Sequence, residues 1–139
     1  MFKILVVEDN KILNDNLNQI LDWESLGMCI VGSAFNGEQG HRMALELKPD
    51  MIIADVDMPK LDGLEMCKKI LSELPDTRFI FISAFDSFKY VQQALDLGAY
   101  KYILKPVMPD KLHAAASELY TIKKKDEANK KMTASSCRS

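Results

Sequence analysis

The sequence has few of the features that mark secreted, membrane-spanning and disulfide-bonded proteins. Its three cysteines, Cys29, Cys67 and Cys137, are widely spaced and form no CxxC pair, so neither a disulfide framework nor a zinc site is predicted. No apolar run approaches the roughly 20 residues that a membrane-spanning helix needs, and the N-terminus lacks the basic and apolar regions of a signal peptide. We expect a cytoplasmic protein that does not enter a membrane.

Glycine is missing from the turn that follows the first predicted strand. A loop that cradles phosphate through its backbone N–H groups is normally rich in glycine. The turn here, residues 8–12, has the sequence EDNKI and begins with two acids. This argues against a flavin- or nucleotide-binding protein built on the same kind of sheet.

Short apolar segments alternate along the chain with segments that have apolar residues at helical spacing. The predicted strands cover residues 3–7, 28–34, 51–55, 78–82 and 100–104. Strands that alternate with helices of about 10 to 15 residues imply βαβ crossovers and a parallel sheet. The sequence therefore predicts an α/β fold with one five-stranded parallel sheet and helices on both of its faces.

Polar residues, glycine and proline mark the ends of the predicted helices. Asn10 and Asn36 are predicted N-caps, and Gln39 would complete a capping box with Asn36. Gly98 follows a helix at a position where the left-handed conformation suits glycine. Pro109 opens the last helix, because its fixed backbone angle suits the first helical position.

Charge is unevenly divided between the body of the chain and its C-terminal end. Residues 1–122 hold 12 basic and 18 acidic side chains, a net charge of −6, and residues 123–139 hold 6 and 2, a net charge of +4. The apolar faces of the first and last helices are predicted to include Ile12 and Ile122, and the periodicity stops at about Lys123. We predict one folded domain over residues 1–122. Residues 123–139 are expected to be a frayed helix end and then a disordered basic tail or linker.

Four of the five predicted strands end in polar residues. Glu8 and Asp9 follow the first strand, Asp55 ends the third, Ser83 follows the fourth and Lys105 follows the fifth. The ligand crevice of an open α/β sheet lies outside the carboxyl ends of its strands, so we expect these side chains at one rim. Three carboxylates there would oppose one another's ionisation unless a cation shared the site. Oxygen ligands of this kind favour Mg²⁺.

This set of residue types suits the transfer of a phosphoryl group to a carboxylate. Asp55 would attack in line, while the metal ion and the Lys105 ammonium neutralise charge on the phosphoryl group. The Ser83 hydroxyl would donate to one of the phosphoryl oxygens.

Taken together, these motifs resemble the receiver domain of a bacterial two-component response regulator over residues 2–122. The matching motifs occur in family order and spacing: Glu8-Asp9, Asp55-x-x-Met58-Pro59-x-x-Asp62-Gly63, Ser83-Ala84 and Lys105-Pro106. The resemblance implies the flavodoxin-like receiver fold with strand order 2-1-3-4-5. It also implies a chain that is not an enzyme beyond its own phosphorylation and dephosphorylation.

The resemblance assigns a role to each residue of the rim. It implies that Asp55 is the phosphoacceptor and that Ser83 and Lys105 contact the phosphoryl group. The implied Mg²⁺ ligands are Glu8 and Asp9 (directly or through water), Asp55 and the backbone carbonyl of Asp57.

The resemblance also implies a conformational switch. Ser83 and Tyr102 would form the switch pair, and the peptide bond between Lys105 and Pro106 would be cis. The switch would alter the surface formed by the fourth helix, the fifth strand and the fifth helix.

Two further segments, residues 22–27 and 83–90, resemble receivers attached to AraC-type transcription factors. We therefore expect a sensor histidine kinase as partner, phosphorylation-enhanced homodimerisation, and DNA binding only through an output domain absent from this chain. Three alternatives stay open. The chain could be a degenerate receiver that acts as a binding module, a stand-alone receiver that docks on a partner, or a phosphatase that uses Asp57 as a further acid.

Overall fold

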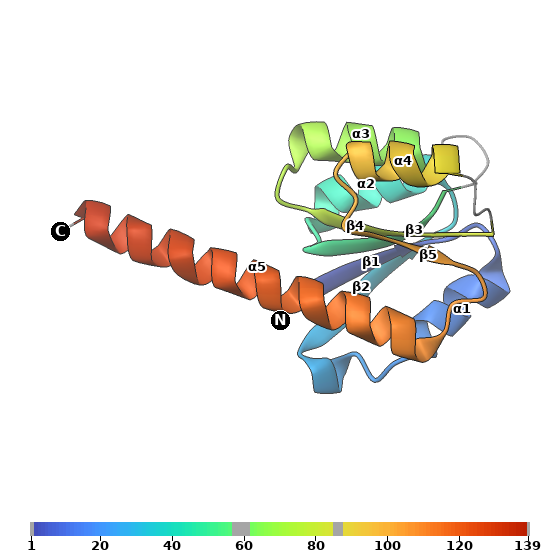
Figure 1. Ribbon diagram of the computed structural model, residues 1–139, viewed down its shortest axis with the longest axis horizontal. Coiled ribbons are helices and arrows are strands. Elements are labelled where there is room, and N and C mark those ends of the chain that lie inside the picture. Colours follow the sequence, from blue (N-terminus) through green and yellow to red (C-terminus); the bar gives the residue numbers. More distant parts are fainter. Residues whose placement is uncertain (1, 57–61, 85–87, 139) are drawn as a thin grey trace.

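Five parallel strands form the sheet around which the molecule is built. The computed structural model describes residues 2–56, 62–84 and 88–138, with side chains except at residues 88–90 and 126–138. The strands are β1 (Phe2–Val7), β2 (Met28–Ala34), β3 (Met51–Asp55), β4 (Arg78–Ser83) and β5 (Lys101–Leu104). Their order in the sheet is β2-β1-β3-β4-β5, which confirms the prediction (Figure 1).

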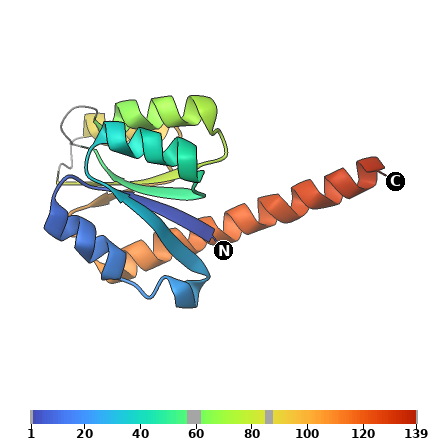
Figure 2. The same cartoon turned by 180° about the vertical axis from the view of Figure 1, so that it is seen from behind.

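Helices cover both faces of this sheet. On one face lie α2 (Gly37–Leu47), α3 (Gly63–Glu73) and α4 (Phe88–Asp96), and on the other lie α1 (Lys11–Gln19) and α5 (Pro109–Arg138) (Figures 1 and 2). A short 3₁₀ turn, η1 (Glu24–Leu26), precedes β2. The predicted α/β architecture with two helical layers is thus confirmed.

The sheet is buried on both faces, which explains why its central strands are continuous apolar runs. All five residues of β3 are buried. Ile52 and Ala54 pack in the core beneath α2 and α3, while Met51 and Ile53 pack in the core beneath α1 and α5. Because β3 is held from both sides and paired with β1 and β4, Asp55 at its end has a firmly fixed backbone.

The predicted helix caps are present. The side chain of Asn10 accepts hydrogen bonds from the N–H groups of Ile12 and Leu13 at 3.0 and 3.2 Å. Asn36 accepts from the N–H of Gln39 as predicted, but the side-chain oxygen of Gln39 accepts from the N–H of Phe35 rather than from that of Asn36. The predicted capping box is therefore only half formed.

The structure also places Gly98 and Pro109 as the sequence predicts. Gly98 has a left-handed backbone with φ of 101° just after α4. Pro109 is the first residue of α5.

Two expectations about the helices are wrong. Ile12 and Ile122 are 73% and 43% exposed rather than buried, because each lies at an end of its amphipathic stretch, beyond the cover of the sheet. α5 continues to Arg138 instead of fraying near Lys123, and its second half extends away from the sheet (Figure 1). Residues 123–138 contain no glycine or proline, so nothing in them interrupts a helix.

The length of α5 does not make it a membrane helix. It has 30 residues, but neither α5 nor any other helix in the described parts of the chain is both long and apolar enough to cross a membrane.

Candidate functional site

The polar residues at the strand ends lie at one rim of the sheet. Glu8 and Asp9 follow β1, Asp55 is the last residue of β3, Ser83 is the last residue of β4, and Lys105 follows β5. These four strands are neighbours in the sheet. The strand ends predicted to share one rim are therefore neighbours in the structure.

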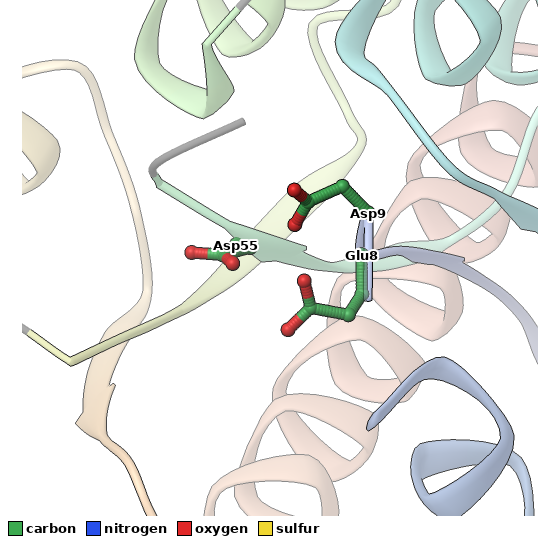
Figure 3. Close-up of side chains that lie close together, drawn as sticks. All are labelled: Glu8, Asp9 and Asp55. Carbon is green, nitrogen blue, oxygen red and sulfur yellow. The ribbon is translucent and has the colours of Figure 1, made fainter. Parts of the chain in front are cut away.

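Three carboxyl groups form the centre of this rim. Glu8, Asp9 and Asp55 each place a carboxylate oxygen within 4.8 Å of the other two, and Figure 3 shows the three side chains beside one another at the ends of β1 and β3. Glu8 and Asp55 are buried while Asp9 is exposed. Hard oxygen donors with one open side suit Mg²⁺, which keeps several of its waters. The predicted ligand Asp57 lies outside the described residues.

Lys105 neutralises part of this negative charge. Its Nζ donates to Glu8 Oε1 at 2.8 Å and to Asp55 Oδ2 at 2.9 Å. Burial alone would lower the pKa of the Lys105 ammonium, but its hydrogen bonds to Glu8 and Asp55 outweigh that effect and raise it. Lys105 is thus a fixed cation directly beside Asp55.

The pKa of the Glu8 carboxyl group is shifted by its surroundings. Burial raises the pKa of Glu8 to about 7, Asp9 and Asp55 act in the same direction, and Lys105 opposes them. The rim therefore holds a carboxyl group that changes charge near neutral pH.

Ser83 ends β4 at this rim, and Tyr102 lies within β5 in register with Phe81. Ser83 is fully buried, and its carbonyl accepts from the N–H of Lys105 at 2.8 Å. Tyr102 is half-buried and packs against the core beneath α2 and α3. The peptide bond from Lys105 to Pro106 is cis, as the resemblance implies.

Gly63 is a site residue whose physical role the sequence reasoning missed. A Cβ at this position would collide with the carbonyl oxygen of Asp55 and lie 3.0 Å from Cα of Val56. The N–H of Gly63 also donates to the carbonyl of Val56 at 2.8 Å. The start of α3 therefore packs directly on the backbone that carries Asp55, which only a residue without a side chain permits. The Asp62-Gly63 pair in the motif was the available clue.

The raised pKa of Glu8 predicts a pH-dependent affinity for Mg²⁺. As the pH falls through about 7, a proton occupies Glu8 and competes with the metal ion, because a carboxylate ligand must be deprotonated. We expect Mg²⁺ to bind about tenfold more weakly at pH 6 than at pH 8. Calorimetric titration at the two pH values measures this. The Glu8→Gln variant, which has no proton to lose at this position, should show a much flatter profile, and an equally steep one would contradict the assignment.

Comparison with known proteins gives one consistent family. The family model described as response regulator receiver domain matches residues 4–117. The chain is 36% identical over 134 residues to the uncharacterized transcriptional regulatory protein YesN of Bacillus subtilis, covering 96% of this chain and 36% of YesN. It is 32% identical over 105 residues to the transcriptional regulatory protein LiaR of the same organism, covering 76% of this chain and 49% of LiaR. The chain thus spans between about a third and a half of these relatives.

Solved structures agree with the sequence comparisons. The REC domain of AraT, a response regulator from Geobacillus stearothermophilus, superposes with a TM-score of 0.85 at 29% identity, over 91% of this chain and 98% of that one. The CheX-CheY-BeF3-Mg complex of Borrelia burgdorferi matches with a TM-score of 0.79 at 28% identity, over 86% of this chain and 89% of that one. The protein with the acidic rim described above belongs to the response regulator receiver domain family.

Proposed function

We propose that this chain accepts a phosphoryl group on Asp55 from a sensor histidine kinase and uses it to switch an output. The observation that carries the proposal is the contact between Lys105 Nζ and Asp55 Oδ2 at 2.9 Å, beside two further carboxyl groups. A carboxylate next to a fixed cation and a set of metal ligands is the arrangement that phosphoryl transfer to an aspartate needs.

Each residue of the rim has a separate task in this transfer. Glu8, Asp9 and Asp55 would hold Mg²⁺, which when bound neutralises charge on the phosphoryl oxygens. A carboxylate oxygen of Asp55 forms the new bond to phosphorus while the bond from phosphorus to the donor breaks, and the electron pair leaves with the donor. Lys105 would exchange a carboxylate partner for a phosphoryl oxygen, and Ser83 would donate to another. The chain then catalyses only its own phosphorylation and dephosphorylation.

A groove beside the rim offers the kinase a place to dock. It has a volume of about 480 Å³ and lies between α1 and the start of α5. Leu13, Leu17 and Val107 form part of its apolar wall, and Glu8 and Lys105 of the rim also line it. A partner helix seated there would hold a phosphohistidine close to Asp55.

The alternatives are less well supported. A degenerate receiver would lack part of the chemical set, whereas Glu8, Asp9, Asp55, Ser83 and Lys105 are all present at the rim. A phosphatase would depend on Asp57, which lies outside the described residues. The similar CheY of Borrelia burgdorferi forms a complex with BeF3 and Mg, and this favours a phosphoacceptor over both alternatives.

The output is proposed to be transcription, through a domain beyond this chain. YesN and LiaR are transcriptional regulatory proteins, and this chain matches only 36% and 49% of their lengths. The body, residues 1–122, carries a net charge of −6 and should not bind DNA by itself. Residues 123–139 would form the basic linker towards an output domain of the AraC type.

The surface of α4, β5 and α5 is proposed to carry the switch to a homodimer. Leu95 and Leu104 are 47% and 44% exposed on this surface, and apolar side chains in such positions are available for pairing with a second copy. Phosphorylation would draw Ser83 towards the phosphoryl group and let Tyr102 move inward, which shifts the balance between two states of this surface.

Phosphorylation of the wild-type chain by a small acyl phosphate tests the proposed function. We expect a phosphate adduct in intact-mass spectra when Mg²⁺ is present and none when the metal ion is removed with EDTA, because the crowded carboxylates repel the donor without it. The adduct should disappear on incubation at alkaline pH, since acyl phosphates hydrolyse readily. If no adduct forms at saturating Mg²⁺, the proposal fails.

A further inference from the structure

Asn14 is a buried polar residue that neither the sequence motifs nor the phosphoryl chemistry explain. It lies on α1 and is fully buried. Its Nδ2 donates to the carbonyl of Glu8 at 3.1 Å and to the carbonyl of Ala34 at 3.0 Å. Burying a side-chain amide costs free energy unless hydrogen bonds satisfy it, so a buried amide of this kind calls for an explanation.

The two carbonyls belong to the point where β1 and β2 separate. The last register pair of the two strands is Val7 with Ala34, and the N–H of Glu8 still donates to the carbonyl of Ala34 at 3.0 Å. Beyond this point the N–H of Phe35 donates to the Gln39 side chain instead. The side-chain amide of Asn14 therefore supplies the hydrogen bonds to these carbonyls at the end of the β1–β2 ladder, where backbone pairing between the strands stops.

Asn14 is itself held in one orientation. Asn18 Nδ2 donates to Asn14 Oδ1 at 3.2 Å, to the Asn14 carbonyl at 2.8 Å and to Ser33 Oγ at 3.1 Å. Because Oδ1 of Asn14 faces a donor, its Nδ2 must face the two carbonyls.

We propose that Asn14 is a positioning residue for the metal-binding acidic pair, an inference that rests on the proposed function. The carbonyl that it holds belongs to the peptide unit joining Glu8 to Asp9. Fixing the plane of this peptide fixes the directions in which the two side chains leave the backbone. Asn14 thus sets the spacing of two of the three carboxyl groups without touching the metal ion or the phosphoryl group.

The Asn14→Leu variant tests this inference through Mg²⁺ affinity. Leucine fills a similar volume but donates no hydrogen bond, so the peptide between Glu8 and Asp9 loses its anchor. We expect Mg²⁺ to bind at least about tenfold more weakly in calorimetric titrations. We also expect faster amide hydrogen exchange at Asp9 and Asn10.

Thr77→Val is the matched control. Thr77 is also buried, and its Oγ1 donates to the carbonyl of Pro49 at 3.1 Å, near the start of β4 at the opposite end of the sheet. Valine removes that donor at nearly constant volume, and Mg²⁺ affinity should stay at the wild-type value. If Thr77→Val weakens Mg²⁺ binding as much as Asn14→Leu does, the effect is general destabilisation and the inference is overturned.

The remaining outcomes separate the inference from the proposed function. If the wild type binds no Mg²⁺, the proposed function fails. If the wild type binds Mg²⁺ and Asn14→Leu binds it equally well, only the positioning role of Asn14 fails. Should Asn14→Leu not fold, Asn18→Ala keeps both donor bonds of Asn14 but frees its amide to turn. That variant should bind Mg²⁺ about threefold more weakly, and wild-type affinity would overturn the inference.

Discussion

The Asp55→Asn variant is expected to lose phosphorylation completely. Asparagine preserves the shape of the side chain at the end of β3 but replaces the attacking carboxylate oxygen with an amide, which is a poor nucleophile. Lys105 Nζ donates to Asp55 Oδ2 at 2.9 Å, and Asp55 ends a strand whose five residues are all buried. No other carboxyl group in the described part of the chain has both features. Intact-mass spectra after incubation with Mg²⁺ and an acyl phosphate should show the adduct on the wild type and none on this variant.

Asp62→Asn provides the matched control. Asp62 is near Asp55 in the sequence, but its side chain caps α3 by accepting from the N–H of Glu65 at 2.8 Å. Asparagine caps a helix about as well as aspartate, so the fold and the extent of phosphorylation should both be preserved. If Asp55→Asn shows the same adduct as Asp62→Asn, the phosphoryl group is carried elsewhere and the assignment of Asp55 is wrong.

The sequence allowed the strands and the rim to be predicted because their causes are local. β3 coincides with the predicted segment, since a strand buried on both faces must be an uninterrupted apolar run. The residues that follow such runs are then brought together by the parallel topology alone. Glu8, Asp55 and Lys105 lie up to 97 positions apart in the sequence, yet each was recognisable from its place at the end of a strand or directly after it.

The features that were missed depend on contacts between elements. Nothing in the neighbouring sequence indicates the role of Asn14, because an asparagine within a helix is ordinarily a solvent-exposed residue. Its amide has two partners only because β1 and β2 diverge beside it. The burial of Ile12 was overestimated because the helical period does not show where the sheet ends. The length of α5 was underestimated because the loss of an apolar face was taken as the end of the helix.

The position of Asp55 depends on α3 as well as on the sheet. The N-terminus of α3 contacts the backbone of Asp55 and Val56 through Gly63, and Asp62 caps the same turn. Displacing this helix end would displace the acceptor from Lys105. The geometry of the rim therefore depends on one glycine as well as on its charged residues.

The Gly63→Ala variant is accordingly expected to damage both stability and phosphorylation. The new Cβ would collide with the Asp55 carbonyl, which belongs to a buried strand and cannot move aside. We expect a loss of about 1–3 kcal/mol in the free energy of unfolding, measured by urea denaturation. Phosphorylation by an acyl phosphate should be about a hundredfold slower, since a displacement of about 1 Å at a reacting group has effects of this size.

Gly32→Ala is the control, because its Cβ meets the flexible end of Met43 at 2.6 Å and that methyl group can move. Phosphorylation of Gly63→Ala at the rate of this control would show that α3 does not position Asp55.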